Sequence, residues 1–148
     1  MKKFSSQTIE KILVPTDGSD YSVRAAEYAI SIAKTHNAEI IALFVVDEVV
    51  VDKFSQSGEQ ANIEGELKAD GQRNVNYIVG LAEKEGVKAQ SIVAKGRPFE
   101  QITGFAKGLE VDLIVMGTYG RRGAERILLG SVAERVIEYS PCPVLVVK

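Results

Sequence analysis

The sequence predicts a three-layer α/β sandwich, in which a five-stranded parallel sheet is covered by helices on both faces. Five short segments rich in Val, Ile and Leu are separated mostly by stretches long enough for a helix. Their apolar residues run continuously, which is typical of strands buried on both faces. Strands that alternate with helices form right-handed crossovers and hence a parallel sheet. Because 148 residues suit one domain, we expect a single domain spanning residues 1–148.

Each predicted strand is one of these apolar segments. They are Lys11 to Pro15, Glu39 to Val46, Ala89 to Ala94, Asp112 to Met116 and Pro143 to Val147. The last segment is expected at an outer edge of the sheet. An apolar edge strand invites pairing with a second copy of the chain. The candidate residues for such a contact are Val144, Leu145, Val146 and Val147.

Apolar residues at intervals of three and four predict four helices between the strands. The second of these ends at Gly86, a typical C-cap residue, and Pro98 suits the first turn of the third. The fourth begins near Ser131. Its expected inner face comprises Val132, Val136 and Ile137.

The stretch from Asp47 to Asp70 departs from this pattern. It is polar, contains Gly58 and Gly65, and has few apolar residues. We therefore expect a long, mobile connection that leads into the second helix and does not form a separate domain.

Composition excludes several classes of partner. The net charge of −2 gives no global attraction to nucleic acid or to an anionic membrane. No apolar segment approaches the roughly 20 residues of a membrane span, and the N-terminal residues lack the apolar region of a secretory signal. The single cysteine, Cys142, cannot form an intrachain disulfide. We expect a cytoplasmic protein with no nucleic-acid partner and no membrane partner.

A glycine-rich segment follows the fourth predicted strand and reads Gly117-Thr-Tyr-Gly120, with Gly130-Ser131 at the start of the last helix. Glycines let backbone N–H groups approach a bulky anion, and a helix N-terminus favours negative charge. Open α/β sheets bind ligands at the carboxyl ends of their strands. The segment therefore predicts a phosphate site. The alternative is structural, with the glycines as turn residues and Ser131 forming a capping box with Glu134.

The same segment resembles the signature of the universal stress protein family, Gly-x2-Gly-x9-Gly-Ser/Thr. The resemblance extends to Ile12-Leu-Val-Pro-Thr-Asp-Gly-Ser19, Gly96-Arg-Pro98 and Cys142-Pro-Val-Leu-Val-Val147. It implies the ATP-binding branch of the family, strand order 3-2-1-4-5, and a nucleotide, ATP or AMP, between strands 1 and 4. It also implies a stress-response regulator that forms a homodimer through strand 5.

The resemblance assigns roles to further residues. Pro15, Thr16 and Asp17 would contact ribose and phosphates, and Asp17 is a candidate ligand for a divalent metal such as Mg²⁺. The alternative for Asp17 is a turn or N-cap residue. Val45 and Val46 are expected to line an adenine slot, with Met116 as a neighbour; the alternative, plain core, is compatible with that role. Val132, next to Ser131, is a further expected nucleotide contact.

Residues suited to phosphate cleavage are scarce. At most one of Arg121 and Arg122 is expected on the terminal phosphate, and paired loop arginines are as often solvated. The lysine of a Walker A motif is missing, and the only histidine, His36, lies at the end of the first predicted helix. The sequence favours nucleotide binding without catalysis. The alternatives are a slow ATPase or phosphotransferase, and an interaction module that uses no nucleotide.

Overall fold

The computed structural model describes residues 8–54, 58, 60–118 and 129–148. Five strands and five helices are assigned over these residues. In chain order they are β1 (Lys11–Pro15), α1 (Asp20–His36), β2 (Glu39–Asp47), α2 (Glu48–Lys53), α3 (Gln60–Lys84), β3 (Ala89–Gly96), α4 (Pro98–Gly108), β4 (Leu113–Gly117), α5 (Ser131–Tyr139) and β5 (Val144–Val147).

The five strands form one parallel sheet in the order β3-β2-β1-β4-β5. Strand β1 lies at its centre and pairs with β2 and β4, with Leu13 opposite both Ile41 and Ile114. The predicted fold class and strand order are thus confirmed. The chain runs from β1 outward through β2 to β3 on one side, and then crosses to β4 and β5 on the other, so the topological switch point lies between β1 and β4.

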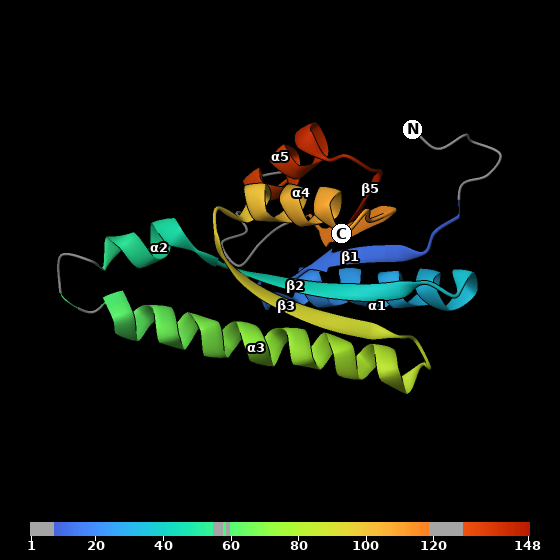
Figure 1. Ribbon diagram of the computed structural model, residues 1–148, viewed down its shortest axis with the longest axis horizontal. Coiled ribbons are helices and arrows are strands. Elements are labelled where there is room, and N and C mark those ends of the chain that lie inside the picture. Colours follow the sequence, from blue (N-terminus) through green and yellow to red (C-terminus); the bar gives the residue numbers. More distant parts are fainter. Residues whose placement is uncertain (1–7, 55–57, 59, 119–128) are drawn as a thin grey trace.

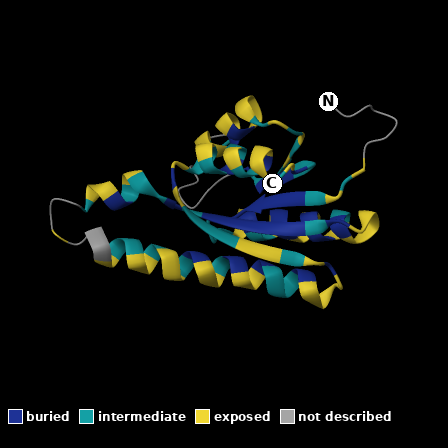
Figure 2. Ribbon diagram, viewed as in Figure 1, coloured by how far each residue is buried: buried dark blue, intermediate teal, exposed yellow. Residues whose placement is uncertain are grey.

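Helices cover both faces of the sheet, as Figure 1 shows, and each face has its own hydrophobic core. Alternate residues of a strand point to opposite faces, so Ile40 and Ala42 of β2 pack with α1 and α3. Ile41 and Leu43 pack instead with α4 and α5. The central strands are the most completely buried part of the chain (Figure 2).

The stretch from Asp47 to Asp70 is more regular than the sequence predicted, because α2 and the first half of α3 occupy most of it. Asp47 caps α2 by accepting a hydrogen bond from the Val49 N–H at 3.0 Å. One α2 side chain, Val51, is fully buried, and Lys95 of β3 forms an ion pair with Glu64 of α3. The expectation of a long connection was wrong for these residues. Helices α2 and α3 extend beyond the carboxyl ends of the strands (Figure 1).

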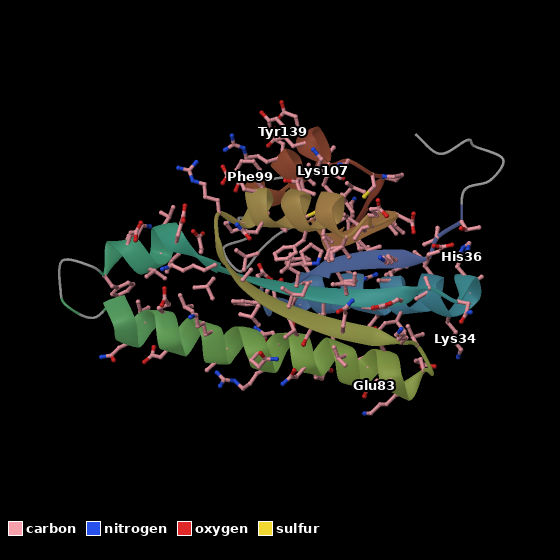
Figure 3. All side chains as sticks on the ribbon, in the orientation of Figure 1. Lys34, His36, Glu83, Phe99, Lys107 and Tyr139 are labelled. Atoms are coloured by element: carbon pink, nitrogen blue, oxygen red, sulfur yellow. The ribbon has the colours of Figure 1, made fainter. Side chains whose placement is uncertain are left out.

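The predicted inner face of α5 is also corrected. Ala133 and Val136 are buried against the sheet, whereas Val132 and Ile137 are 37% and 47% exposed. The helix is further held against α4 by its own outer residues. The Arg135 guanidinium lies 4.4 Å above the Phe99 ring, whose centroid is 6.0 Å from that of Tyr139. Figure 3 shows Phe99 and Tyr139 side by side on these two helices.

Candidate functional site

The candidate site lies where β1 and β4 end, at the switch point of the sheet. The pairing of Leu13 with Ile114, continued along both strands, brings Thr16 level with Gly117. Beyond these residues β1 turns into α1, while α5 begins at Ser131 on the other side of the sheet. Two connections therefore leave adjacent strands in opposite directions, which is the arrangement that forms the ligand crevice of open α/β sheets.

The turn between β1 and α1 is fixed by hydrogen bonds to a buried threonine. Thr16 is 7% exposed, and its Oγ1 lies 2.9 Å from the Ser22 Oγ. The Gly18 N–H donates to the same Thr16 oxygen at 3.2 Å. Gly18 has a φ of 83°, in the left-handed region that favours glycine. These bonds set the path of the backbone on which Asp17 is carried.

Asp17 organises this turn but does not cap α1. Its Oδ1 accepts a hydrogen bond from the Ser19 N–H at 2.9 Å. Ser19 is the N-cap residue, because its Oγ accepts from the Ser22 N–H at 3.2 Å. The turn interpretation of Asp17 is therefore confirmed and the N-cap interpretation is wrong. A carboxylate held at the mouth of the crevice is suited to accept hydrogen bonds from a ribose or to bind a cation that accompanies phosphates.

Gly117 is needed for packing, whatever the crevice binds. A Cβ at this position would lie 2.9 Å from the carbonyl carbon and the Cβ of Tyr21, and 3.0 Å from the Tyr21 oxygen. Real Cβ atoms essentially never come that close, so the end of β4 meets the first turn of α1 because Gly117 has no side chain. This contact joins the two walls of the crevice. The sequence alone suggested only a turn or an approach to phosphate for this glycine, because the contact with Tyr21 spans distant parts of the chain.

The N-terminus of α5 is preceded by a glycine, which has no side chain to cap it. Gly130 is the N-cap residue and makes no side-chain cap hydrogen bond, and Ser131 is the first helical residue. The predicted capping box of Ser131 with Glu134 is therefore wrong, and the side chain of Ser131 is exposed. Uncapped N–H groups and the helix dipole favour an anion at this helix end.

The three residues predicted to line an adenine slot divide between the two faces of the sheet. Val45 and Met116 pack in the core beneath α4 and α5. Val46 points to the opposite face and is fully buried in the core beneath α1 and α3. The side chains of Val45 and Met116 are therefore on a common face, whereas Val46 offers a ligand only its backbone.

The remaining residues considered in the sequence lie outside the described part of the chain, beside the crevice or far from it. Gly120, Arg121 and Arg122 lie outside the described residues. Val132 is in the first turn of α5 and partly exposed, next to the uncapped helix end. His36 lies at the opposite end of α1 from the crevice, as Figure 3 shows.

Metal binding by the protein alone has no support in the described ranges. Over residues 8–54, 58, 60–118 and 129–148, no three His, Cys, Asp or Glu side chains gather as a set of metal ligands. A cation held by Asp17 would therefore need oxygens from a bound phosphate. Cys142 is half-buried, and burial raises the pKa of its thiol while the hydrogen bond with Ser140 opposes that rise. A protonated thiol is a poor nucleophile and ligand, in keeping with a structural role.

Two polar residues near the crevice were missed by sequence analysis. Ser22 lies beneath the β1–α1 turn, and Thr118, 6% exposed, follows β4 directly. The Thr118 carbonyl accepts a hydrogen bond from the Gly130 N–H at 2.6 Å. A polar residue immediately after a buried strand was the only sequence signal for Thr118.

The fold and this crevice define a doubly wound α/β protein with its ligand edge at the β1–β4 switch point. A model of the universal stress protein family matches residues 8–148, and the chain belongs to this family. No helix in the described part of the chain is long and apolar enough to span a bilayer.

Known relatives match almost the whole chain. The universal stress protein MJ0531 of Methanocaldococcus jannaschii is 48% identical over 139 residues, covering 94% of this chain and 82% of the relative. The solved structure of MJ0577, from the same organism, superposes with a TM-score of 0.86 at 34% identity, covering 96% and 97% of the two chains. A universal stress protein solved in complex with cAMP superposes with a TM-score of 0.70 at 27% identity, covering 95% and 98%.

Proposed function

We propose that this protein is an adenine-nucleotide-binding regulator of the stress response, from the ATP-binding branch of its family, with the nucleotide in the β1–β4 crevice. One observation carries the proposal. The turn bearing Asp17, the end of β4 at Gly117 and the uncapped N-terminus of α5 meet at the topological switch point. The related protein in complex with cAMP supports an adenine nucleotide as the class of ligand.

Each part of the ligand has a chemically suitable partner. Phosphates would accept hydrogen bonds from the backbone of the first turn of α5, beginning at Ser131, where the helix dipole adds a positive partial charge. Gly130, whose N–H donates to the Thr118 carbonyl, would set the position of that turn. The ribose would donate hydroxyl hydrogens to Asp17, which is anchored by Ser19. Adenine would pack on the apolar face of Val45 and Met116. Pro15, Thr16 and Val132 would flank the ligand, and Gly120 with one of Arg121 and Arg122 would complete the phosphate site.

The proposal is tested by identifying what the protein binds. We expect mass spectrometry to find ATP or AMP in the protein as purified from cells. We also expect calorimetric titration of nucleotide-free protein to show ATP binding with a Kd in the micromolar range or tighter. Omitting Mg²⁺ should weaken ATP binding more than AMP binding, because a cation offsets the greater phosphate charge of ATP. If no nucleotide copurifies and ATP gives neither heat nor a thermal shift, the interaction-module alternative is correct.

Slow catalysis is the second candidate function, and a turnover assay distinguishes it. We expect the ATP-loaded protein to release phosphate for no more than one turnover over hours, because the sequence lacks a Walker A lysine and its only histidine, His36, lies at the far end of α1. Sustained release that Asp17→Ala abolishes would favour the enzyme. Sustained release that Asp17→Ala leaves unchanged would indicate a contaminating ATPase.

The regulator is also proposed to work as a homodimer through the free edge of β5. Strand β5 is an edge of the sheet, and Leu145 on it is 38% exposed. The carbonyls of Pro143 and Val147 accept hydrogen bonds from β4, so the backbone of Val144 and Val146 faces outward.

Blocking that outward edge should separate the subunits. We expect Val146→Pro to weaken dimerisation about tenfold, because proline removes an outward N–H but leaves the bonds to β4 intact. The matched control Val146→Ala keeps the N–H and should weaken dimerisation less. Sedimentation velocity over a concentration series measures both effects. A wild-type protein that sediments as a monomer at high micromolar concentration would contradict the proposed interface.

A further inference from the structure

We infer that Thr118 is a positioning residue, whose side chain sets how firmly the N-terminus of α5 is held against the end of β4. The inference deepens the proposed function and rests on it, because α5 supplies the proposed phosphate contacts. Thr118 itself is buried and would not contact the nucleotide. Its effect would pass through Gly130.

Three hydrogen bonds meet at Thr118. Its N–H donates to the Val147 carbonyl at 2.9 Å, and its Oγ1 donates to the same oxygen at 3.2 Å. Its own carbonyl accepts from the Gly130 N–H at 2.6 Å. Thr118 therefore bridges the end of β5 and the N-cap residue of α5. The bond to Gly130 joins residues that are 12 positions apart in the sequence.

The side-chain bond to Val147 explains why a hydroxyl suits this position. The two bonds from Thr118 to one carbonyl anchor its N–H and its Oγ1, which fixes its χ1 rotamer and holds its Cα in place, so that ψ is the rotation left to direct its own carbonyl. That carbonyl aims at Gly130, which has the extended conformation of an N-cap residue, with φ −67° and ψ 154°. A side chain without the hydroxyl would leave the Thr118 carbonyl freer to turn.

The arrangement also connects β5 to the proposed anion site, through Thr118 and Gly130. The carbonyl of Val147 is the common acceptor for Thr118, and Val147 is itself 7% exposed and packed in the core beneath α1. A shift of the end of β5 would therefore pass through Thr118 to Gly130. In the sequence, β5 and the phosphate segment are separate features, and only the fold connects them.

The test compares Thr118→Val, which keeps the shape but removes the donor, with Thr118→Ser, which keeps the donor. We expect Thr118→Val to weaken ATP binding about three- to tenfold, the range of one net hydrogen bond, and to leave adenosine binding within about twofold. Thr118→Ser should bind ATP nearly as the wild type does. The matched control is Thr103→Val, which removes a hydroxyl bonded at 2.9 Å to the Phe99 carbonyl within α4, and it should change neither affinity.

A second measurement tests the geometry without any nucleotide. In wild-type protein, the Gly130 amide should be protected from hydrogen exchange, because its N–H donates to the Thr118 carbonyl at 2.6 Å. Thr118→Val should accelerate exchange at Gly130 but not in the central strand β1. An unprotected Gly130 amide in the wild-type protein, or equal protection of Gly130 in the wild type and in Thr118→Val, would overturn the inference. So would equal losses of ATP and adenosine affinity in a folded Thr118→Val protein, whereas a wild-type protein that binds no nucleotide overturns the proposed function alone.

Discussion

Gly117→Ala should lower ATP affinity at least tenfold and the free energy of unfolding by about 2–3 kcal/mol. The new Cβ would lie 2.9 Å from two atoms of Tyr21, one of them a backbone carbon. Because backbone cannot rotate aside as a side-chain tip can, either α1 or the end of β4 must move. Both elements border the proposed nucleotide site, so the displacement should reach it. Calorimetric titration with ATP and urea unfolding measure the two effects.

Gly104→Ala in α4 is the matched control for this substitution. No atom lies within 4 Å of the position its Cβ would occupy, and alanine is a better helix former than glycine by about 0.5–1 kcal/mol. This variant should be slightly more stable than the wild type and bind ATP equally well. A Gly117→Ala protein that loses stability but binds ATP normally would limit Gly117 to packing. One that is unchanged in both measurements would contradict the close approach of β4 to α1.

Gly71→Ala is expected to have the second largest effect, a loss of about 2 kcal/mol in the free energy of unfolding. Gly71 is buried on the inner side of α3, where a Cβ would lie 2.8 Å from Cγ and 2.9 Å from Cε1 of Phe44. The Phe44 ring is 5% exposed and enclosed by the core beneath α1 and α3. It can make room only by displacing its neighbours.

Gly80→Ala, in the same helix, isolates this packing effect from helix propensity. Nothing lies within 4 Å of its added Cβ, so the change should stabilise the protein by about 0.5–1 kcal/mol. Urea unfolding measures the free energy of unfolding of both variants. An unchanged m-value would show that the same two-state analysis applies to each. Equal stabilities for the Gly71→Ala and Gly80→Ala proteins would show that α3 does not press on Phe44.

The sheet could be predicted from sequence because its strands are buried on both faces. Continuous apolar runs such as the one before Asp47 occur in few other settings. Only the second half of α3 was predicted. The described residues of its first half are mostly exposed, and Leu67 is the apolar side chain there that packs against the core, so the apolar spacing of a helix is weak. There the contact with β3 is an ion pair, between Glu64 and Lys95, and apolar periodicity does not report ion pairs.

The error in α5 has a different origin. The helix has nine residues, too few for periodicity to identify its buried face when one inward residue is the small Ala133. Val132 and Ile137 are larger and more apolar, yet the structure leaves both exposed.

The candidate site was predictable in its local parts but not in its long-range contacts. Glycines after β4 and the start of α5 can be located along the chain without any knowledge of the fold. The contact of Gly117 with Tyr21 joins positions 96 residues apart, and the Thr118 side chain bonds to a backbone carbonyl 29 residues away. Every residue has a backbone carbonyl, so no sequence pattern shows which of them accepts a hydrogen bond from a distant side chain.

The central position of β1 has a consequence for how the protein acquires its binding capacity. The Asp112 carboxylate accepts hydrogen bonds from the Glu10 and Lys11 N–H groups, which lie 102 and 101 residues away. Closing such a long segment is entropically costly, and contacts of this range slow folding. The crevice thus forms only when β1 and β4 pair, and no part of the binding site exists in the unfolded chain. A ligand held there would raise the midpoint of thermal unfolding in proportion to the logarithm of its concentration over Kd, so thermal stability would itself report the supply of nucleotide.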